Sequence, residues 1–204
     1  MEIRDRTLEP GRGIVFTSAG YNPAVFDKFL RDNPDALPFR LVEGVYRIDA
    51  PGKATLVVEG GADRYKLERP NGILITPDDR YLYIADNNNN THGGSRKLLR
   101  YTLDKKGDIT GPPKVLFDWK DGRGPDGMKM DAAGRIYVAA GTNKATEYET
   151  NRFKAGCYIL SPSGRLIDFI PTAPDEACNC AFGGKDGKTL FITSGGHLWC
   201  VPLK

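Results

Sequence analysis

The stretch "RPNGILITPDDRYLYIADNNNN", residues 69–90, carries the pattern from which the fold can be predicted. After its Asn-Gly dipeptide comes a short apolar run, then a turn rich in Asp, then a second run that combines aromatic residues with Ile. Related stretches are "GPDGMKMDAAGRIYVAAGTN" at residues 124–143 and "CNCAFGGKDGKTLFITSG", which begins at residue 178. Asn71, Asp126 and Asn179 align in the three copies at nearly equal spacing, so the chain contains an internal repeat.

Each copy opens a unit of short strands separated by turns. The apolar runs are rich in Val, Ile, Tyr and Phe, while Gly, Pro, Asp and Asn gather between them, as is typical of β-strands and their turns. Four strands in a unit of roughly 40–50 residues are typical of a β-propeller blade. The repeat therefore predicts an all-β fold, a β-propeller with about three and a half four-stranded blades.

The predicted organisation is a single domain over residues 1–204. The first blade is expected to hold only its second to fourth strands, and the last copy ends after its third strand. One short helix is predicted at 22–32, inserted between strands, because Asn22 can cap it and Pro23 suits its first turn. The expected blades lie near 13–60, 70–118, 125–172 and 178–204.

The composition is that of an ordinary globular chain, 40% hydrophobic and 27% charged, with a formal net charge of +3. The sequence contains no basic run with interleaved aromatic residues, which a nucleic-acid-binding surface would need. It also contains no apolar segment that approaches the roughly 20 residues of a membrane span. Neither nucleic acid nor membrane is therefore predicted as a partner, and the oligomeric state is open. "MEIRDRTLEPGRG" at the N-terminus has no apolar core, which favours the cytoplasm, with the periplasm or secretion as alternatives if the N-terminus is truncated.

The four cysteines are Cys157, Cys178, Cys180 and Cys200. Cys178 and Cys180 form a C-x-C pair, which raises the possibility of zinc. A structural zinc site needs about four nitrogen or sulfur ligands, and neither histidine of the chain has ligand spacing with this pair. The pattern favours small apolar side chains within strands.

The aligned Asn71, Asp126 and Asn179 are the candidates for chemistry. In a propeller the innermost strand of each blade begins near the central channel, so equivalent residues of successive blades point toward one axis. An Asn carbonyl oxygen and an Asp carboxylate suit Ca²⁺ or Mg²⁺, and less selectively Mn²⁺ or Zn²⁺. Tight turns are the alternative, since Asn-Gly and Asp-Gly are common turn dipeptides. The dipeptides precede the strands at a fixed offset, while the hairpin turns are expected elsewhere, and this favours the ligand interpretation.

A polar segment, "DNNNNTHGG" at 86–94, is similar in its alternating Asp and Asn residues to a calcium-binding loop. Thr91 stands where such a loop needs glycine, and no Glu closes it. The segment is therefore predicted to be a long polar loop on one face of the propeller.

Four stretches together resemble one known family. They are "ERPNGILITPDDRYLYIADN", "GPDGMKMDAAGRIYVAAG", "GCYILSPSGRLIDFIPT" and "CNCAFGGKDGKTLFITSGGHLWCV". In this order they resemble the regucalcin/gluconolactonase (senescence-marker-protein-like) family of six-bladed β-propeller lactonases. The resemblance covers most of residues 13–204.

The resemblance implies a divalent metal on the channel axis, usually calcium, and hydrolysis of a small-molecule sugar lactone such as a gluconolactone. It implies that Asn71 and Asp126 are metal ligands and that Asp126 is also the acid/base. Asn179 belongs to the family pattern as a channel-lining residue.

The chain also departs from the family pattern. The family's first-blade Glu ligand, in an "EGP"-like motif, has no counterpart, and the "ND" motif that opens the third blade is absent. The resemblance thus implies a member that lacks its first two blades and the start of the third, as a truncated or a degenerate copy. We expect weak or no metal binding by these 204 residues alone. The alternatives to a lactonase are a non-catalytic propeller that binds a ligand or protein, and a different hydrolase on the same scaffold.

Overall fold

The computed structural model describes residues 14–18, 44–50, 53–60 and 67–203. These residues form strands, turns and loops without a helix, which confirms the all-β prediction for them. The predicted helix at 22–32 lies outside the described residues. Within the described part of the chain, no helix has the length and apolar character that crossing a membrane would require.

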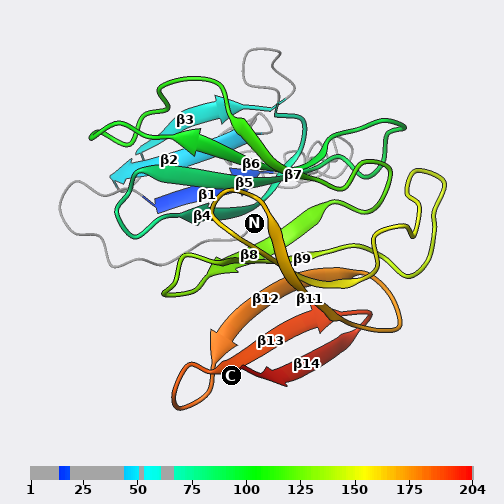
Figure 1. Ribbon diagram of the computed structural model, residues 1–204. Helices are drawn as coiled ribbons and strands as arrows, with labels where there is room; N and C mark the ends of the chain where they lie inside the picture. Colours follow the sequence, from blue (N-terminus) through cyan, green and yellow to red (C-terminus); the bar gives the residue numbers. More distant parts are fainter. Residues whose placement is uncertain (1–13, 19–43, 51–52, 61–66, 204) are drawn as a thin grey trace, which may run out of the picture.

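The strands form four antiparallel sheets, each built from strands that follow one another in the chain (Figure 1). Short hairpin turns fall at "TPDDR", "DAAGR" and "SPSGR", as the sequence indicates, and longer loops at 88–95 and 141–155 join other neighbouring strands. The first sheet contains β1 (Ile14–Ser18), β2 (Gly44–Ala50) and β3 (Lys53–Glu59). The second contains β4 (Pro70–Ile75), β5 (Tyr81–Asn87), β6 (Arg96–Thr102) and β7 (Lys114–Asp118). The third contains β8 (Pro125–Met130), β9 (Ile136–Ala140), β10 (Gly156–Leu160) and β11 (Leu166–Pro171). The fourth contains β12 (Ala177–Gly183), β13 (Thr189–Ser194) and β14 (His197–Pro202).

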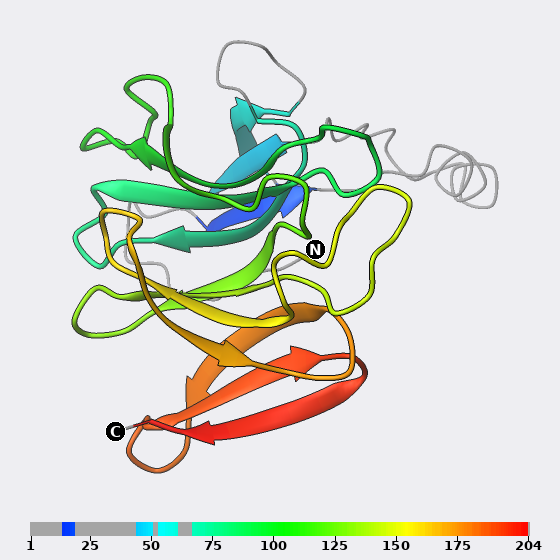
Figure 2. The same cartoon turned by 45° about the vertical axis from the view of Figure 1, so that its right-hand side comes forward.

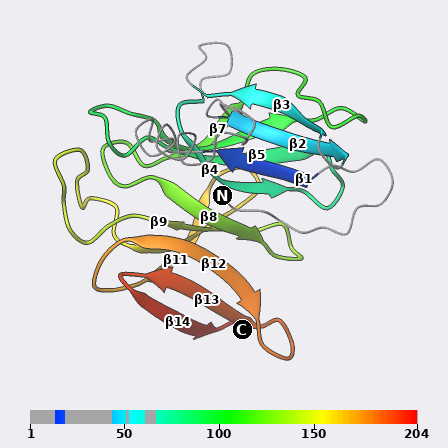
Figure 3. The same cartoon turned by 180° about the vertical axis from the view of Figure 1, so that it is seen from behind.

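Successive sheets lie face to face, as Figures 2 and 3 show from two further directions. The first strands of the last three sheets are neighbours, because β8 packs between β4 and β12. The hydrogen-bond ladders between strands run within the sheets. Packed side chains hold the sheets together, with scattered hydrogen bonds such as that from the backbone N–H of Ala177 to the carbonyl oxygen of Gly141. The single domain and the blade limits given above stay predictions.

A separate apolar core fills each space between neighbouring sheets. Strand β5 shows how one sequence serves two cores. Its Leu82 and Ile84 pack toward the first sheet, while Tyr83 and Ala85 pack toward the third, and all four are buried. A strand covered on both faces needs apolar residues at successive positions, which explains the unbroken run "YLYIA".

Candidate functional site

The three aligned residues, here called the ring residues, are Asn71 on β4, Asp126 on β8 and Asn179 on β12. Each lies near the beginning of the first strand of its sheet, and each is partly exposed. The pairing with the next strand shifts register at this point in all three sheets. The dipeptides Asn-Gly and Asp-Gly therefore lie inside strands, and the turn interpretation is wrong.

The glycines after Asn71 and Asp126 have a packing role. A Cβ added to Gly72 would collide with the main-chain carbonyl oxygen of Asp126, and one added to Gly127 would collide with the side-chain amide of Asn179. Asp126 and Asn179 thus lie directly against the glycine of the preceding inner strand. A side chain at either glycine would force neighbouring strands apart, so the glycines are required for close backbone approach and not for a turn.

Arg123, three residues before Asp126, forms ion pairs with three carboxylates beside the ring residues. Its Nη2 lies 3.7 Å from Oδ2 of Asp126, and its Nη1 lies 3.5 Å from Oε2 of Glu149 and 3.1 Å from Oε2 of Glu176. The guanidinium side chain is 11% exposed and that of Glu149 only 4%. These four residues, here called the Arg123 cluster, carry one positive and three negative charges, so the ring region favours a cation.

Burial raises the pKa of the Glu149 carboxyl, and the positive charges of Arg123 and Arg96 oppose that shift. Burial therefore disfavours the charged form of Glu149, and its basic neighbours stabilise that form. Glu149 comes from the long loop between β9 and β10, whereas Arg123 comes from the loop that precedes β8. The ion pair joins these two loops beside the ring.

Cys178 is the thiol nearest the ring and lies between the strand residues Ala177 and Asn179. Burial raises its pKa, and the negative charges of Asp126 and Glu176 raise it further. A thiol with a raised pKa is a poor nucleophile at neutral pH, because the thiolate is the reactive form. The surroundings of Cys178 therefore favour the thiol over the thiolate. Cys180, in contrast, is buried and donates from its Sγ to the carbonyl oxygen of Tyr137 at 3.4 Å.

Asp86, at the end of β5, fixes the segment that leads into Asn71. Its fully buried carboxylate accepts hydrogen bonds from the backbone N–H of Glu68, at 3.1 Å, and of Arg69, at 2.6 Å. Burial raises the pKa of Asp86, and these backbone donors lower it again. Asp86 therefore has a structural role, because it holds the segment just before β4 in place.

The donors available for a metal are few. The described residues contain no group of three or more His, Cys, Asp or Glu side chains placed to hold a metal ion. The ring offers one carboxylate, from Asp126, and amide oxygens from Asn71 and Asn179. The Oδ1 of Asn179 already accepts the backbone N–H of Cys180 at 2.9 Å, so this oxygen has less capacity for a metal than that of a free amide.

Known proteins show the same organisation. A family model described as "SMP-30/Gluconolactonase/LRE-like region" matches residues 23–196. The chain belongs to this family. A gluconolactonase of Zymomonas mobilis is 31% identical over 168 residues, which are 79% of this chain and 40% of that protein.

Solved structures of the family agree with the observed sheets. The structure of a gluconolactonase from Xanthomonas campestris matches with a TM-score of 0.63 and 25% identity, over 94% of this chain and 54% of that one. A calcium-binding protein, regucalcin, from Agrobacterium tumefaciens matches with a TM-score of 0.57 and 21% identity, over 96% and 54% of the two chains. These matches confirm the β-propeller fold class and the family resemblance. The chain spans about half the length of these solved relatives.

The sequence did not predict the Arg123 cluster. Arg123 stands close to the "PDG" motif, and this proximity was the only available signal. Glu149 and Glu176 lie in loops whose lengths differ from each other, and nothing in the repeat relates them to the ring. Their placement beside Asp126 depends on how the loops fold over the ends of the strands.

Proposed function

We propose that the protein opens a small-molecule sugar lactone by adding water to its carbonyl carbon, at the ring residues and with a divalent metal. The main support is the alignment of Asn71, Asp126 and Asn179 on three adjacent inner strands, each packed against the preceding strand. The relatives named gluconolactonase from Zymomonas mobilis and Xanthomonas campestris support this substrate class.

The donor chemistry of the ring fits a hard divalent cation. Asn71 and Asp126 would hold it, and calcium fits best because both donors are oxygens, with Mg²⁺, Mn²⁺ and Zn²⁺ as the alternatives. The calcium-binding regucalcin among the structural neighbours supports this choice. When bound, such a cation polarises a carbonyl oxygen and makes a water more acidic.

Asp126 is the residue proposed to move the proton. Its carboxylate takes a proton from the attacking water and later returns it to the ring oxygen that leaves the carbonyl carbon, so the product is the open-chain hydroxy acid. Arg123, 3.7 Å away, orients this carboxylate. Asn71 and Asn179 line the channel beside it, where their amides can hydrogen-bond to the hydroxyl groups of a sugar.

The test is a pH-stat assay with glucono-δ-lactone, measured against spontaneous hydrolysis in buffer, with and without added calcium chloride. We expect calcium-dependent hydrolysis that falls at least 100-fold in Asp126→Asn, consistent with loss of general acid–base catalysis. Asp168→Asn, a change on β11, is the matched control and should leave the rate unchanged. Hydrolysis that survives both Asp126→Asn and a calcium chelator would refute the proposal.

Calcium affinity is a separate expectation. Calcium usually takes 6–8 oxygen ligands, and the ring supplies one carboxylate with two amides. We expect the 204-residue chain to bind calcium with a Kd weaker than micromolar in a calorimetric titration. A chain that binds calcium through Asp126 but hydrolyses no lactone would instead be a non-catalytic binding module.

A further inference from the structure

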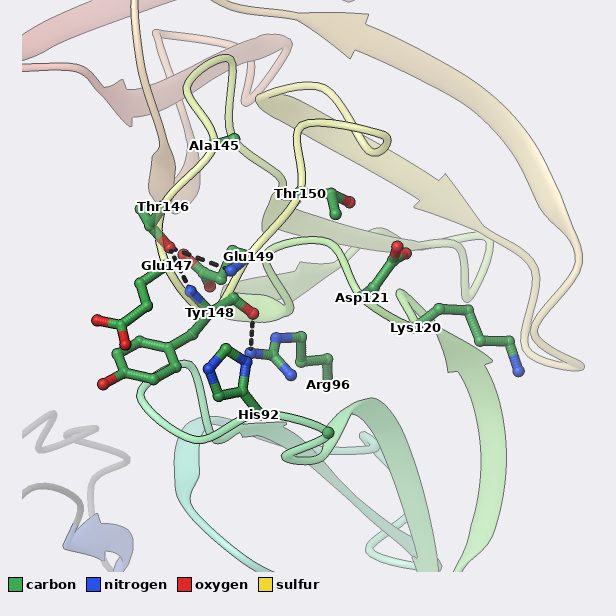
Figure 4. A pocket seen from close by; sticks show the side chains of 11 residues that line it. His92, Arg96, Lys120, Asp121, Ala145, Thr146, Glu147, Tyr148, Glu149 and Thr150 are labelled. Atoms are coloured by element: carbon green, nitrogen blue, oxygen red, sulfur yellow. Dashed lines mark hydrogen bonds between the residues drawn. The ribbon is translucent and has the colours of Figure 1, made fainter.

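A pocket lies at the end of the sheets where the ring residues lie. It has a volume of about 400 Å³ and is bounded by three loops, 88–95, 119–124 and 141–155 (Figure 4). These loops follow β5, β7 and β9, at the end of the sheets where the ring residues lie. The volume falls within the range of small-molecule sites, roughly 300–1,000 Å³.

Glu149 connects this pocket to the ring. It lines the pocket, and its Oε2 lies 3.5 Å from Nη1 of Arg123, whose other amino group faces Asp126. One buried carboxylate is therefore shared between the pocket wall and the Arg123 cluster. Two ion pairs that share Arg123 thus connect the pocket wall to Asp126.

The pocket wall contains a buried donor and a buried acceptor for which the described part of the chain provides no hydrogen-bond partner. Arg96, which is 1% exposed, donates from Nη1 to the carbonyl of Gly94 and from Nη2 to that of Tyr148, both at 2.8 Å. Among the described residues, neither its Nε nor Oε1 of Glu149 has a hydrogen-bond partner. Buried polar atoms of native proteins are nearly always hydrogen-bonded, so these two atoms are candidate contacts for a bound molecule or a water.

The buried donor and the buried acceptor together indicate the chemistry of the molecule that would bind them. A hydroxyl group both donates and accepts, so a molecule rich in hydroxyl groups, directly or through water, satisfies the arginine and the carboxylate together. A purely anionic or purely cationic ligand satisfies only one of them. The wall carries both signs of charge, with the positive Arg96 and Lys120 and the negative Asp121, Glu147 and Glu149.

An aromatic surface completes the pocket. The rings of His92 and Tyr148 meet edge to face, with their centroids 4.9 Å apart. Tyr148 is partly exposed, and Thr146 fixes its loop by accepting the backbone N–H of Tyr148 and of Glu149. An aromatic face offers a flat apolar contact of the kind that suits the C–H groups of a sugar ring, while the acidic side chains around it bind hydroxyl groups.

We propose that this pocket is a subsite for a neutral sugar ring, so that the preferred lactone carries a glycosyl substituent. The substrate class is then a lactone of a disaccharide aldonic acid, with its lactone ring at Asp126 and its sugar ring against Tyr148. This proposal rests on the proposed lactonase function for its catalytic part. The binding of a neutral sugar in the pocket does not depend on that function.

The binding test uses cellobiose, a neutral disaccharide that is not a lactone, and ligand-observed NMR with the 204-residue chain. We expect saturable binding that Tyr148→Ala weakens at least tenfold. His92→Ala, at an exposed position, should weaken it several-fold and serves if Tyr148→Ala does not fold. Glu59→Gln, on β3, is the control and should bind as the unaltered protein does. Absence of saturable binding, or binding unaffected by both pocket variants, would overturn the proposal.

The catalytic test compares glucono-δ-lactone with cellobiono-δ-lactone. We expect kcat/KM to be about tenfold higher for the disaccharide lactone, a difference of about 1.4 kcal/mol. Tyr148→Ala should abolish this preference, bringing kcat/KM for the two lactones to within about twofold of each other. If both lactones are inert but cellobiose still binds through Tyr148, the lactonase function fails and the sugar site stands. Equal rates for both lactones would refute the substrate class.

Discussion

Replacing Arg123 by Met should destabilise the protein through one specific carboxylate, that of Glu149. Methionine fills a similar volume but removes the positive charge that faces three acidic side chains. Glu176 is 44% exposed, so loss of its ion pair should cost no more than about 1 kcal/mol. Glu149 is 4% exposed and would lose its nearest cation. Breaking a buried pair by removing one partner typically costs about 3–5 kcal/mol.

Protonation sets an upper limit on that cost. A carboxyl with an ordinary pKa of 4.5 can be neutralised at pH 7 for about 3.4 kcal/mol, since each pKa unit corresponds to about 1.4 kcal/mol. The Glu149 side chain would take up a proton rather than exceed this value. We therefore expect Arg123→Met to lower the free energy of unfolding by about 3 kcal/mol at pH 7. At pH 5 the same limit is only about 0.7 kcal/mol, and the loss should shrink accordingly.

The assay is urea-induced unfolding followed by tryptophan fluorescence, at pH 5 and pH 7, for which the buried Trp119 is a suitable probe. The double variant Arg123→Met/Glu149→Gln removes both charges, and it should recover most of the stability lost at pH 7. Glu176→Gln is the matched control and should change stability by less than about 1 kcal/mol. A loss that is equal at both pH values, or that the double variant does not recover, would refute the assigned role of Glu149.

Three further predictions concern the packing and titration of the same region. Gly72→Ala should cost about 1–3 kcal/mol in urea unfolding, because its Cβ meets the neighbouring inner strand. Gly111→Ala, where the added Cβ meets nothing, should be neutral within about 0.5 kcal/mol, and equal effects would contradict the packing argument. Asp86→Ala should cost about 1.5–3 kcal/mol in thermal or urea unfolding, since the backbone N–H groups of Glu68 and Arg69 lose the buried carboxylate that accepts them. Because burial raises the pKa of Glu149, the folded state binds its proton more tightly than the unfolded state does. The unaltered protein should therefore lose stability relative to Glu149→Gln as the pH rises above 4.5, and a relative gain in parallel urea titrations would contradict this sign.

Much of the fold could be predicted because the repeat constrains it. A strand with both faces covered needs consecutive apolar residues, and a meander needs a turn after each strand, so "YLYIA" and "TPDDR" could be recognised by local chemistry alone. The register shift at the start of β4, β8 and β12 could not be predicted in this way. It depends on the distance between neighbouring sheets, which is a property of the packed molecule.

The candidate site likewise contains residues that the repeat could predict and residues that it could not. The ring residues could be predicted because they occupy one position of a repeated strand, and the repeat brings such positions together. Arg123, Glu149 and Glu176 come from non-repeated segments, and their meeting is determined by loop conformation and by the need to pair a buried charge. Sequence periodicity carries no information about such contacts.

The Arg123 cluster links stability to the proposed chemistry. Arg123 neutralises the buried Glu149 and also faces Asp126. Its positive charge therefore stabilises the fold and repels a cation bound at the ring residues. Removing that charge should therefore strengthen calcium binding while it weakens the fold. The double variant with Glu149→Gln separates the two effects, because it restores the fold and keeps the ring free of the positive charge. Calorimetric titration of this double variant should show tighter calcium binding than the unaltered chain. Equal or weaker binding would show that Arg123 and the metal do not compete for the carboxylate of Asp126.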